Sequence, residues 1–206
     1  MTTGVLFAGI QFVHPSEELA SVSTGRWSVV GALTFAMAVA GLVGITGLYL
    51  VQVERSGVPG LVGYLLLAGF HLLTASYTFT EAVVLPPLVG IAPLFVTDVI
   101  GIPSGGEPVG DVGALGIFGP ISGVLFTGGG VLFGFGLWRG RVVPRPAAIL
   151  LVAGSLAPLL AALLPEECLR CAALPVALAL VVLGGSLWRH RRTEVAVPGG
   201  ARATVG

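Results

Sequence analysis

The sequence has no lysine and few charged residues of any kind. Only 10% of its 206 residues are Asp, Glu, Lys or Arg, and all 10 basic residues are arginine. Soluble domains carry about 25% charged residues, so this composition excludes an ordinary water-soluble globule. The formal net charge is +0, which gives no reason to expect a nucleic-acid partner.

The sequence also lacks the motifs of common enzymes and cofactor sites. It has no HExxH, no Gly-x-Ser-x-Gly and no paired catalytic carboxylates, and the glycines at 128–130 lie in an apolar run without a following lysine. The possible metal donors His14, His71, Glu81 and Asp98 match no ligand spacing. We therefore expect no metal ion, no cofactor and no catalytic residue, which argues against an enzyme.

What the sequence has instead is long apolar runs. Hydrophobic residues make up 55% of the chain, and the mean hydropathy is +0.99. A membrane-spanning helix needs about 20 apolar residues. The runs lie at about 1–13, 27–51, 60–85, 113–138, 146–164 and 171–188. They predict an all-α, polytopic transmembrane bundle of about six spans, or five if the short first segment does not cross.

The connections and the arginines predict a topology. A tight turn at 54–59 makes the second and third spans antiparallel neighbours, and segment 86–111 fits a re-entrant or interfacial connection. One side then holds eight arginines against two on the other, Arg26 and Arg170. The eight are Arg55, Arg139, Arg141, Arg145, Arg189, Arg191, Arg192 and Arg202. Basic residues favour the cytoplasmic side. We therefore expect a bacterial plasma-membrane protein with both termini cytoplasmic, a bundle over 1–188 and a disordered tail over 189–206.

Glycine is abundant, with 32 residues, and it is concentrated in the fourth predicted span. Gly116, Gly123 and Gly130 repeat at heptad spacing. Small residues let membrane helices approach closely, so we expect this span to be central, with neighbours against the heptad face. On this interpretation Gly123→Leu loosens the bundle.

A polar stripe runs along the third predicted span. At helical spacing one side carries Tyr64, His71, Thr74, Thr78 and Glu81. Ionisable groups are costly in hydrocarbon, so this side should face other helices or a water-filled cavity.

The hypothesis for this stripe is a proton-linked or ligand-binding cavity open to the outside. Glu81 would lie at its mouth and His71 near mid-membrane, and Asp98 and His14 could reach the same mouth. The alternative is a structural cluster in which His71 bonds a neighbouring helix and Glu81 lies among lipid headgroups. The candidate binding residues are His71, Thr74, Thr78, Glu81 and Asp98.

The two cysteines supply a second functional hypothesis. Cys168 and Cys171 form a CxxC motif in a predicted outward loop at the start of a helix, where a thiolate is stabilised. Membrane-embedded thiol–disulfide oxidoreductase activity would use this pair. Against it, quinone-linked enzymes of that kind have a second cysteine pair, which this chain lacks. The structural interpretation is a small disulfide in an oxidising compartment.

Two segments resemble a known group of proteins. They are the stretch from Gly136 through Trp138 to the Val-Val-Pro-Arg-Pro-Ala-Ala run at 142–148, and the Phe-Thr-Glu-Ala run at 79–82 that leads into Pro86. Together they resemble a diffuse group of uncharacterised multi-pass membrane proteins of high-GC bacteria. This resemblance implies a helical membrane protein and carries no activity. The functional expectation is a protein of the lipid bilayer that binds or moves a small molecule, or acts as an accessory membrane subunit.

Overall fold

The computed structural model describes residues 1–161 and 174–195, and this part of the chain is helical with no strand. The prediction of an all-α fold is therefore confirmed. The α-helices are α1 (Thr2–Val13), α2 (Leu19–Val22), α3 (Gly25–Phe79), α4 (Leu85–Leu88), α5 (Pro93–Gly101), α6 (Phe118–Gly140), α7 (Arg145–Ala161) and α9 (Leu174–Val195). A π-helical turn (Thr80–Val84) and two 3₁₀ turns (Ile102–Ser104, Gly113–Ile117) complete the order.

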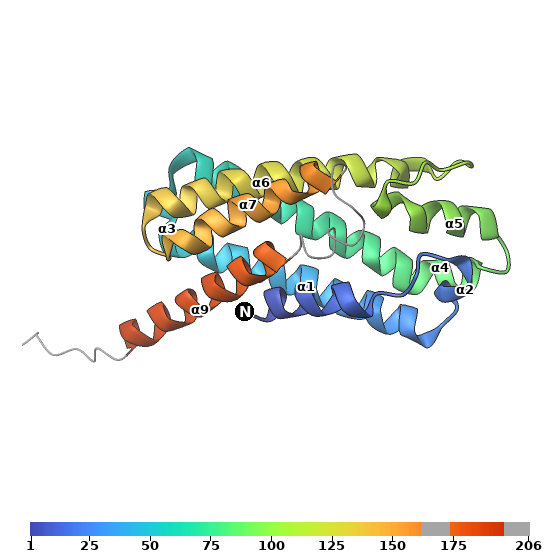
Figure 1. Cartoon of the computed structure of the whole chain (residues 1–206), viewed down its shortest axis with the longest axis horizontal. Helices are drawn as coiled ribbons and strands as arrows, with labels where there is room; N and C mark the ends of the chain where they lie inside the picture. Colours follow the sequence, from blue (N-terminus) through green and yellow to red (C-terminus); the bar gives the residue numbers. More distant parts are fainter. Residues whose placement is uncertain (162–173, 196–206) are drawn as a thin grey trace, which may run out of the picture.

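The long helix α3 is a helical hairpin. Its backbone leaves helical geometry at Gln52 and at Gly57, where φ is 61°, and the chain reverses there (Figure 1). We call residues 25–51 its first arm and 58–79 its second arm. The ring of Tyr49 stacks on that of Tyr64 at 4.7 Å, whereas Phe35 meets Phe79 at 6.4 Å. The pair close to the turn joins residues 49 and 64, and the pair far from the turn joins residues 35 and 79. The two arms are therefore antiparallel, as predicted.

Two helices of the described chain are long and apolar enough to cross a membrane. They are Gly25–Leu88, which contains the whole hairpin, and Gly113–Gly140. Four apolar helices are shorter, namely Thr2–Val13, Pro93–Ser104, Arg145–Leu159 and Leu174–Arg189. By this criterion the predicted count of six spans is not reached. The helix α9 also runs past the expected start of the tail at 189, and residues 196–206 lie outside the described residues.

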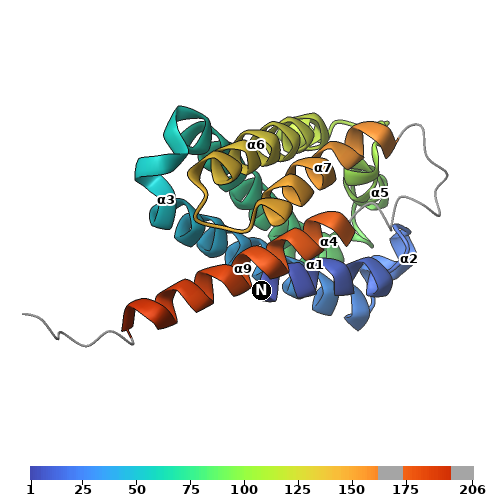
Figure 2. The ribbon, with the colours of Figure 1, turned by 60° about the vertical axis from the view of Figure 1, so that its left-hand side comes forward.

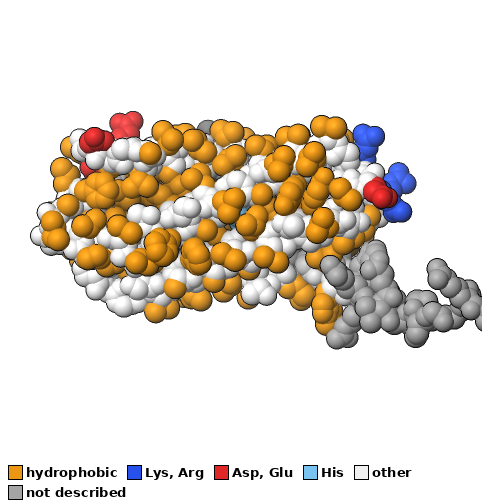
Figure 3. All heavy atoms as spheres, turned by 180° about the vertical axis from the view of Figure 1, so that it is seen from behind, with side chains coloured by type: hydrophobic (Ala, Val, Ile, Leu, Met, Phe, Trp, Pro, Cys, Tyr) orange, Lys and Arg blue, Asp and Glu red, His pale blue; other side chains and the backbone are white. Residues whose placement is uncertain are grey.

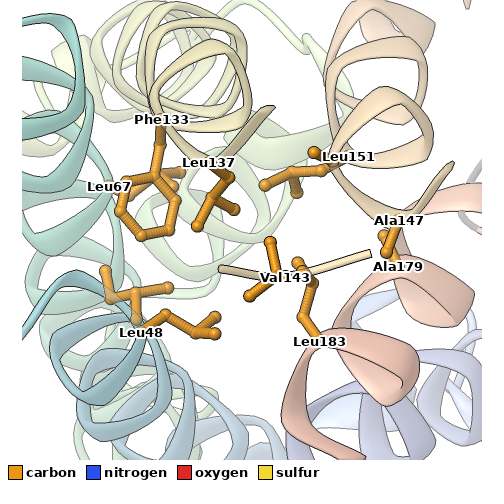
Figure 4. Close-up of a cluster of buried hydrophobic side chains, with 11 residues drawn as sticks. Leu48, Leu67, Phe133, Leu137, Val143, Ala147, Leu151, Ala179 and Leu183 are labelled. Atoms are coloured by element: carbon orange, nitrogen blue, oxygen red, sulfur yellow. The ribbon is translucent and has the colours of Figure 1, made fainter. Parts of the chain in front are cut away.

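The helices form a ring around one apolar core. Going round the ring, α3 contacts α6, α6 contacts α7, α7 contacts α9, and α9 contacts α1, which returns to α3 (Figures 1 and 2). Side chains from all of these helices except α1 fill the centre, and they are drawn in Figure 4. The large side chains of this core include Leu48, Leu67, Phe133, Leu137, Leu151 and Leu183.

Charged side chains lie at the two ends of this bundle. On the face shown in Figure 3 one end carries acidic groups, the other carries the arginines together with acidic atoms, and hydrophobic side chains cover the length between them. The turn of α3 and the α6–α7 connection share one end, which we call the arginine end (Figure 1). The opposite end, which we call the acidic end, holds α2, α4 and α5 (Figure 1).

Glycines of α6 mediate close helix contacts, and among the described residues the predicted heptad face takes part in them at Gly130 but not at Gly123. A Cβ placed on Gly130 would lie 2.5 Å from the Cβ of Ser155 on α7. A Cβ placed on Gly129 would lie 2.8 Å from the backbone nitrogen of Leu67, and one on Gly136 would lie 2.6 Å from the Cα of Gly60. At Gly123 nothing of the described chain lies within 4 Å of an added Cβ. The predicted close contact at Gly123 is therefore not found within the described residues. There, α7 lies against α6 at Gly130 and Gly134.

Candidate functional site

His71 lies between the two arms of α3, near the middle of the second arm. It is 9% exposed. Gly41 of the first arm makes room for it, because a Cβ on Gly41 would lie 2.3 Å from the imidazole Cε1. The Phe70 ring meets the imidazole edge-on at 5.3 Å. The ring nitrogens of His71 form no hydrogen bond within the described chain.

A cavity of about 50 Å³ adjoins this imidazole. Its walls come from α1, both arms of α3, α6, α7 and α9, and they are apolar apart from Thr3, His71 and Thr74. The hydroxyl of Thr74 is buried and has no hydrogen-bond partner. Buried polar groups are bonded in the large majority of cases, to protein or to water. The unpaired hydroxyl at the wall of this cavity therefore leaves a hydrogen-bonding group for a polar molecule in the cavity.

The polar groups of the cavity can both donate and accept hydrogen bonds. A neutral imidazole has one N–H donor and one nitrogen acceptor, and a threonine hydroxyl has both functions. No carboxylate or arginine lines the cavity. The site is thus suited to a small neutral molecule with hydrogen-bonding groups, and not to a free ion, since an unpaired charge is costly in an apolar cavity.

A larger cavity of about 310 Å³ adjoins the first one. The two share Thr3, Ile45, Leu48 and Leu180 in their walls. Gly44 also lines the larger cavity, and nothing lies within 4 Å of a Cβ placed there. The space next to His71 therefore continues between α1, the first arm of α3 and α9, toward the arginine end.

The rest of the predicted stripe does not line the His71 cavity. Thr78 is buried and donates its hydroxyl to the carbonyl oxygen of Thr74 at 2.8 Å. Tyr64 shares a 3.2 Å hydrogen bond with Thr46. Glu81 lies 10 residues beyond His71, roughly 15 Å along a helix. The stripe does face inward, as predicted, but it divides into three parts. Tyr64 bonds Thr46 nearer the arginine end, His71 and Thr74 line the central cavity, and Thr78 and Glu81 lie nearer the acidic end.

Asp98 and His14 hold local structure at the acidic end. Asp98 on α5 is buried, and its Oδ2 accepts a 2.8 Å hydrogen bond from the backbone N–H of Gly110. His14 is exposed, with Nδ1 2.9 Å from the carbonyl oxygen of Pro15. The structure therefore places neither side chain in the wall of the cavity beside His71.

Glu81 belongs to the π-helical turn that connects α3 to the proline pair of α4. The backbone N–H of Leu85 bonds to the carbonyl of Thr80, five residues back. In that register the carbonyl of Glu81 would bond to residue 86, but proline has no N–H. The indole N–H of Trp27 takes this place at 2.9 Å. Trp27 is 4% exposed, so it is a buried hydrogen-bond donor.

Tyr77 is a residue of this region that the sequence reasoning missed. It is buried, its hydroxyl donates to the carbonyl of Val99 on α5, and its ring stacks on Phe118 at 3.8 Å. Pro103 lies four residues after Val99, where an α-helical N–H donor would stand, and it has none. Pro86 thus marked a carbonyl that needed another donor, which was a usable signal in the sequence. At Val99 the tyrosine adds a second bond to the one that the backbone N–H of Ile102 donates.

No group of three His, Cys, Asp or Glu side chains in the described chain could hold a metal ion. Cys168 and Cys171, the predicted redox or disulfide pair, lie outside the described residues. Comparisons of the chain with protein-family models, with curated proteins and with solved structures found no match in any of the three.

Proposed function

We propose that this chain is a multi-pass plasma-membrane protein that binds a small neutral solute in the cavity beside His71. The proposed membrane arrangement has six spans and both termini on the cytoplasmic side. Its support is the distribution of charge, since hydrophobic side chains cover the bundle between a basic end and an acidic end (Figure 3). Arg55, Arg139 and Arg141 lie in the turns at one end, as the preference of basic residues for the cytoplasmic side requires.

The observation that carries the binding function is the unpaired, buried hydroxyl of Thr74 beside His71. One water needs about 10–15 Å³, so the 50 Å³ cavity accommodates a few waters or a solute of about two to four heavy atoms. Such a solute would accept from or donate to Thr74 and the imidazole while its apolar part contacts Phe70 and Leu67. Short alcohols and small amides have this chemistry.

The test compares two threonines on the same helix. Thr74→Val removes the unpaired hydroxyl at the cavity, and Thr78→Val removes a hydroxyl that is bonded within its own helix and does not line the cavity. Full-length protein in lipid nanodiscs, labelled with ¹⁵N-histidine, is titrated with formamide and with methanol. We expect a saturable shift of the His71 ring resonance in the wild type and in Thr78→Val. In Thr74→Val the affinity should fall about three- to tenfold, the value of one neutral hydrogen bond.

Stability measurements separate a binding role from a structural one. If the Thr74 hydroxyl only fills space, replacing it by an isosteric methyl leaves binding unchanged and raises stability, because an unsatisfied polar group is removed. Equal titration curves for the wild type and Thr74→Val, or no saturable shift with either probe, would contradict the proposed function.

A further inference from the structure

A third cavity, of about 460 Å³, lies at the arginine end, far from His71. It is formed by the turn of α3 and by the connection that follows α6. Arg55 comes from the first of these segments and Arg141 from the second. Two guanidinium groups that are distant in sequence thus line the same hollow.

The backbone of both segments is shaped for this approach. Gly57 has a φ of 61°, which lets the α3 hairpin reverse just after Arg55. Arg141 itself has a φ of 56°, a left-handed conformation that is uncommon for a residue other than glycine, and it ends α6 beside the cavity. Arg141, one of the two cations of the cavity, thus has the strained backbone conformation.

The charges of these two arginines are not paired with a carboxylate of the described residues. Arg55 and Arg141 form no ion pair in the part of the chain that the structure describes. Glu54 also lines the cavity, so two positive charges stand against one negative charge. Gln52 in the same wall is 2% exposed, lies against Gly140, and has no hydrogen-bond partner for either amide atom. The cavity therefore has excess positive charge and polar groups that the protein leaves unsatisfied.

We propose that this cavity binds the phosphate group of an anionic ligand, and that in the membrane this ligand is the headgroup of an acidic glycerophospholipid. Guanidinium groups bind phosphate through paired hydrogen bonds, and their charge cannot be lost by deprotonation. The arginine end of a membrane-spanning bundle lies at the depth of lipid phosphates, where basic pockets between helices bind such headgroups. This inference is independent of the solute proposed at His71.

The experiment measures lipid binding to the purified full-length protein in detergent by native mass spectrometry. The probes are short-chain phosphatidylglycerol, phosphatidylcholine with the same acyl chains, and inorganic phosphate. Arg55→Gln and Arg141→Gln remove a cation of the cavity. Arg139→Gln is the matched control, because it makes the same change of charge at an exposed arginine that does not line the cavity.

We expect phosphatidylglycerol to bind more tightly than phosphatidylcholine, and Arg55→Gln or Arg141→Gln to weaken it about tenfold, the value of one charge-assisted contact. Arg139→Gln should bind like the wild type, and Glu54→Gln should bind more tightly because the opposing carboxylate is gone. A gain of affinity cannot be explained by a folding defect.

Inorganic phosphate that binds as tightly as the lipid, with the same dependence on Arg141, would identify free phosphate as the ligand of the same site. Equal weakening by Arg139→Gln and Arg141→Gln, or no preference for the acidic lipid over phosphatidylcholine, would overturn the proposal.

Discussion

The middle of the bundle and its acidic end are held together in different ways. Between α3 and α6 the contact is made at glycines. The backbone of Phe133 occupies the space that a Cβ on Gly63 would need, and the backbone of Gly60 occupies the space that a Cβ on Gly136 would need. At the acidic end the contacts come from large aromatic side chains with one polar atom, Trp27 and Tyr77, each donating to a main-chain carbonyl of another segment.

The difference follows from where backbone hydrogen bonds are missing. In the middle each helix satisfies its own backbone, and the association of apolar helices then depends on close packing, which small residues allow. At the acidic end Pro86 and Pro103 remove N–H donors, so the Glu81 carbonyl of the π turn needs a donor from elsewhere, and the Val99 carbonyl of α5 keeps only the bond from Ile102 within its own segment. A tryptophan and a tyrosine supply these donors and also fill the space between the segments.

The largest expected effect is at the glycine contact. A Cβ on Gly63 would lie 2.1 Å from the backbone nitrogen of Phe133, so Gly63→Ala must move α6 as a unit. We expect a loss of stability of about 3 kcal/mol or more, beyond the usual range for overpacking because the obstacle is backbone. Thermal unfolding in detergent measures it.

The control for this prediction lies on the same arm of α3. Gly69→Ala places its Cβ 3.6 Å from a side-chain carbon of Leu125, an ordinary contact. Alanine favours a helix over glycine by about 1 kcal/mol, so this variant should be as stable as the wild type or more stable. If both variants unfold alike, close backbone contact is not what holds α3 to α6.

The second effect is at the π turn. Trp27→Phe keeps the aromatic ring and removes the N–H that bonds to the Glu81 carbonyl, which should cost about 1–3 kcal/mol because a buried acceptor is left unpaired. The cost should shrink when Pro86→Ala supplies a backbone N–H in the same place. A double-mutant cycle on thermal stability tests this coupling. If the effects of the two substitutions on stability are additive, the Trp27 N–H does not compensate for the N–H that Pro86 lacks.

The smallest effect is expected for Tyr77→Phe. The Val99 carbonyl also accepts from the backbone N–H of Ile102, so it keeps one partner when the tyrosine hydroxyl is lost. We expect a cost of about 0.5–1.5 kcal/mol, the net value of one hydrogen bond. Hydrogen exchange over α5 should show faster opening there and unchanged protection in α6. Faster exchange throughout α6 would mean that Tyr77 supports the middle of the bundle as well.

Part of this structure was predictable from sequence. The hydropathy of the runs and the turn at 54–59 predicted the helices and the antiparallel arms of α3, and the spacing of His71 and Thr78 predicted that both face inward. These features depend on the period of a single helix and on local turn chemistry, which a sequence displays directly.

The remaining features depend on how separate helices lie against one another. Heptad spacing selected Gly116, Gly123 and Gly130, but the contacts are set by where α7 and the second arm of α3 run, and periodicity within α6 does not carry that information. The grouping of His71 with Glu81 assumed that one helix face means one cavity. Thr78, which bonds to its own helix, and Tyr77, which packs in a separate buried cluster, lie between the two residues. Of the stripe, only His71 and Thr74 line the cavity that α1 and α9 help to enclose.

The central claim is that the cavity beside His71 holds a polar molecule that is hydrogen-bonded to His71 and Thr74. The most direct measurement is magnetisation transfer between water and the His71 ring or the Thr74 hydroxyl in nanodiscs, recorded with and without dissolved xenon. Apolar cavities stay dry and take up xenon, whereas polar ones hold water that is hydrogen-bonded to their walls. We expect cross-peaks from bound water at His71 that disappear in Thr74→Val and decrease when formamide is added. A dry cavity that takes up xenon, with no water contact at either side chain, would contradict the claim.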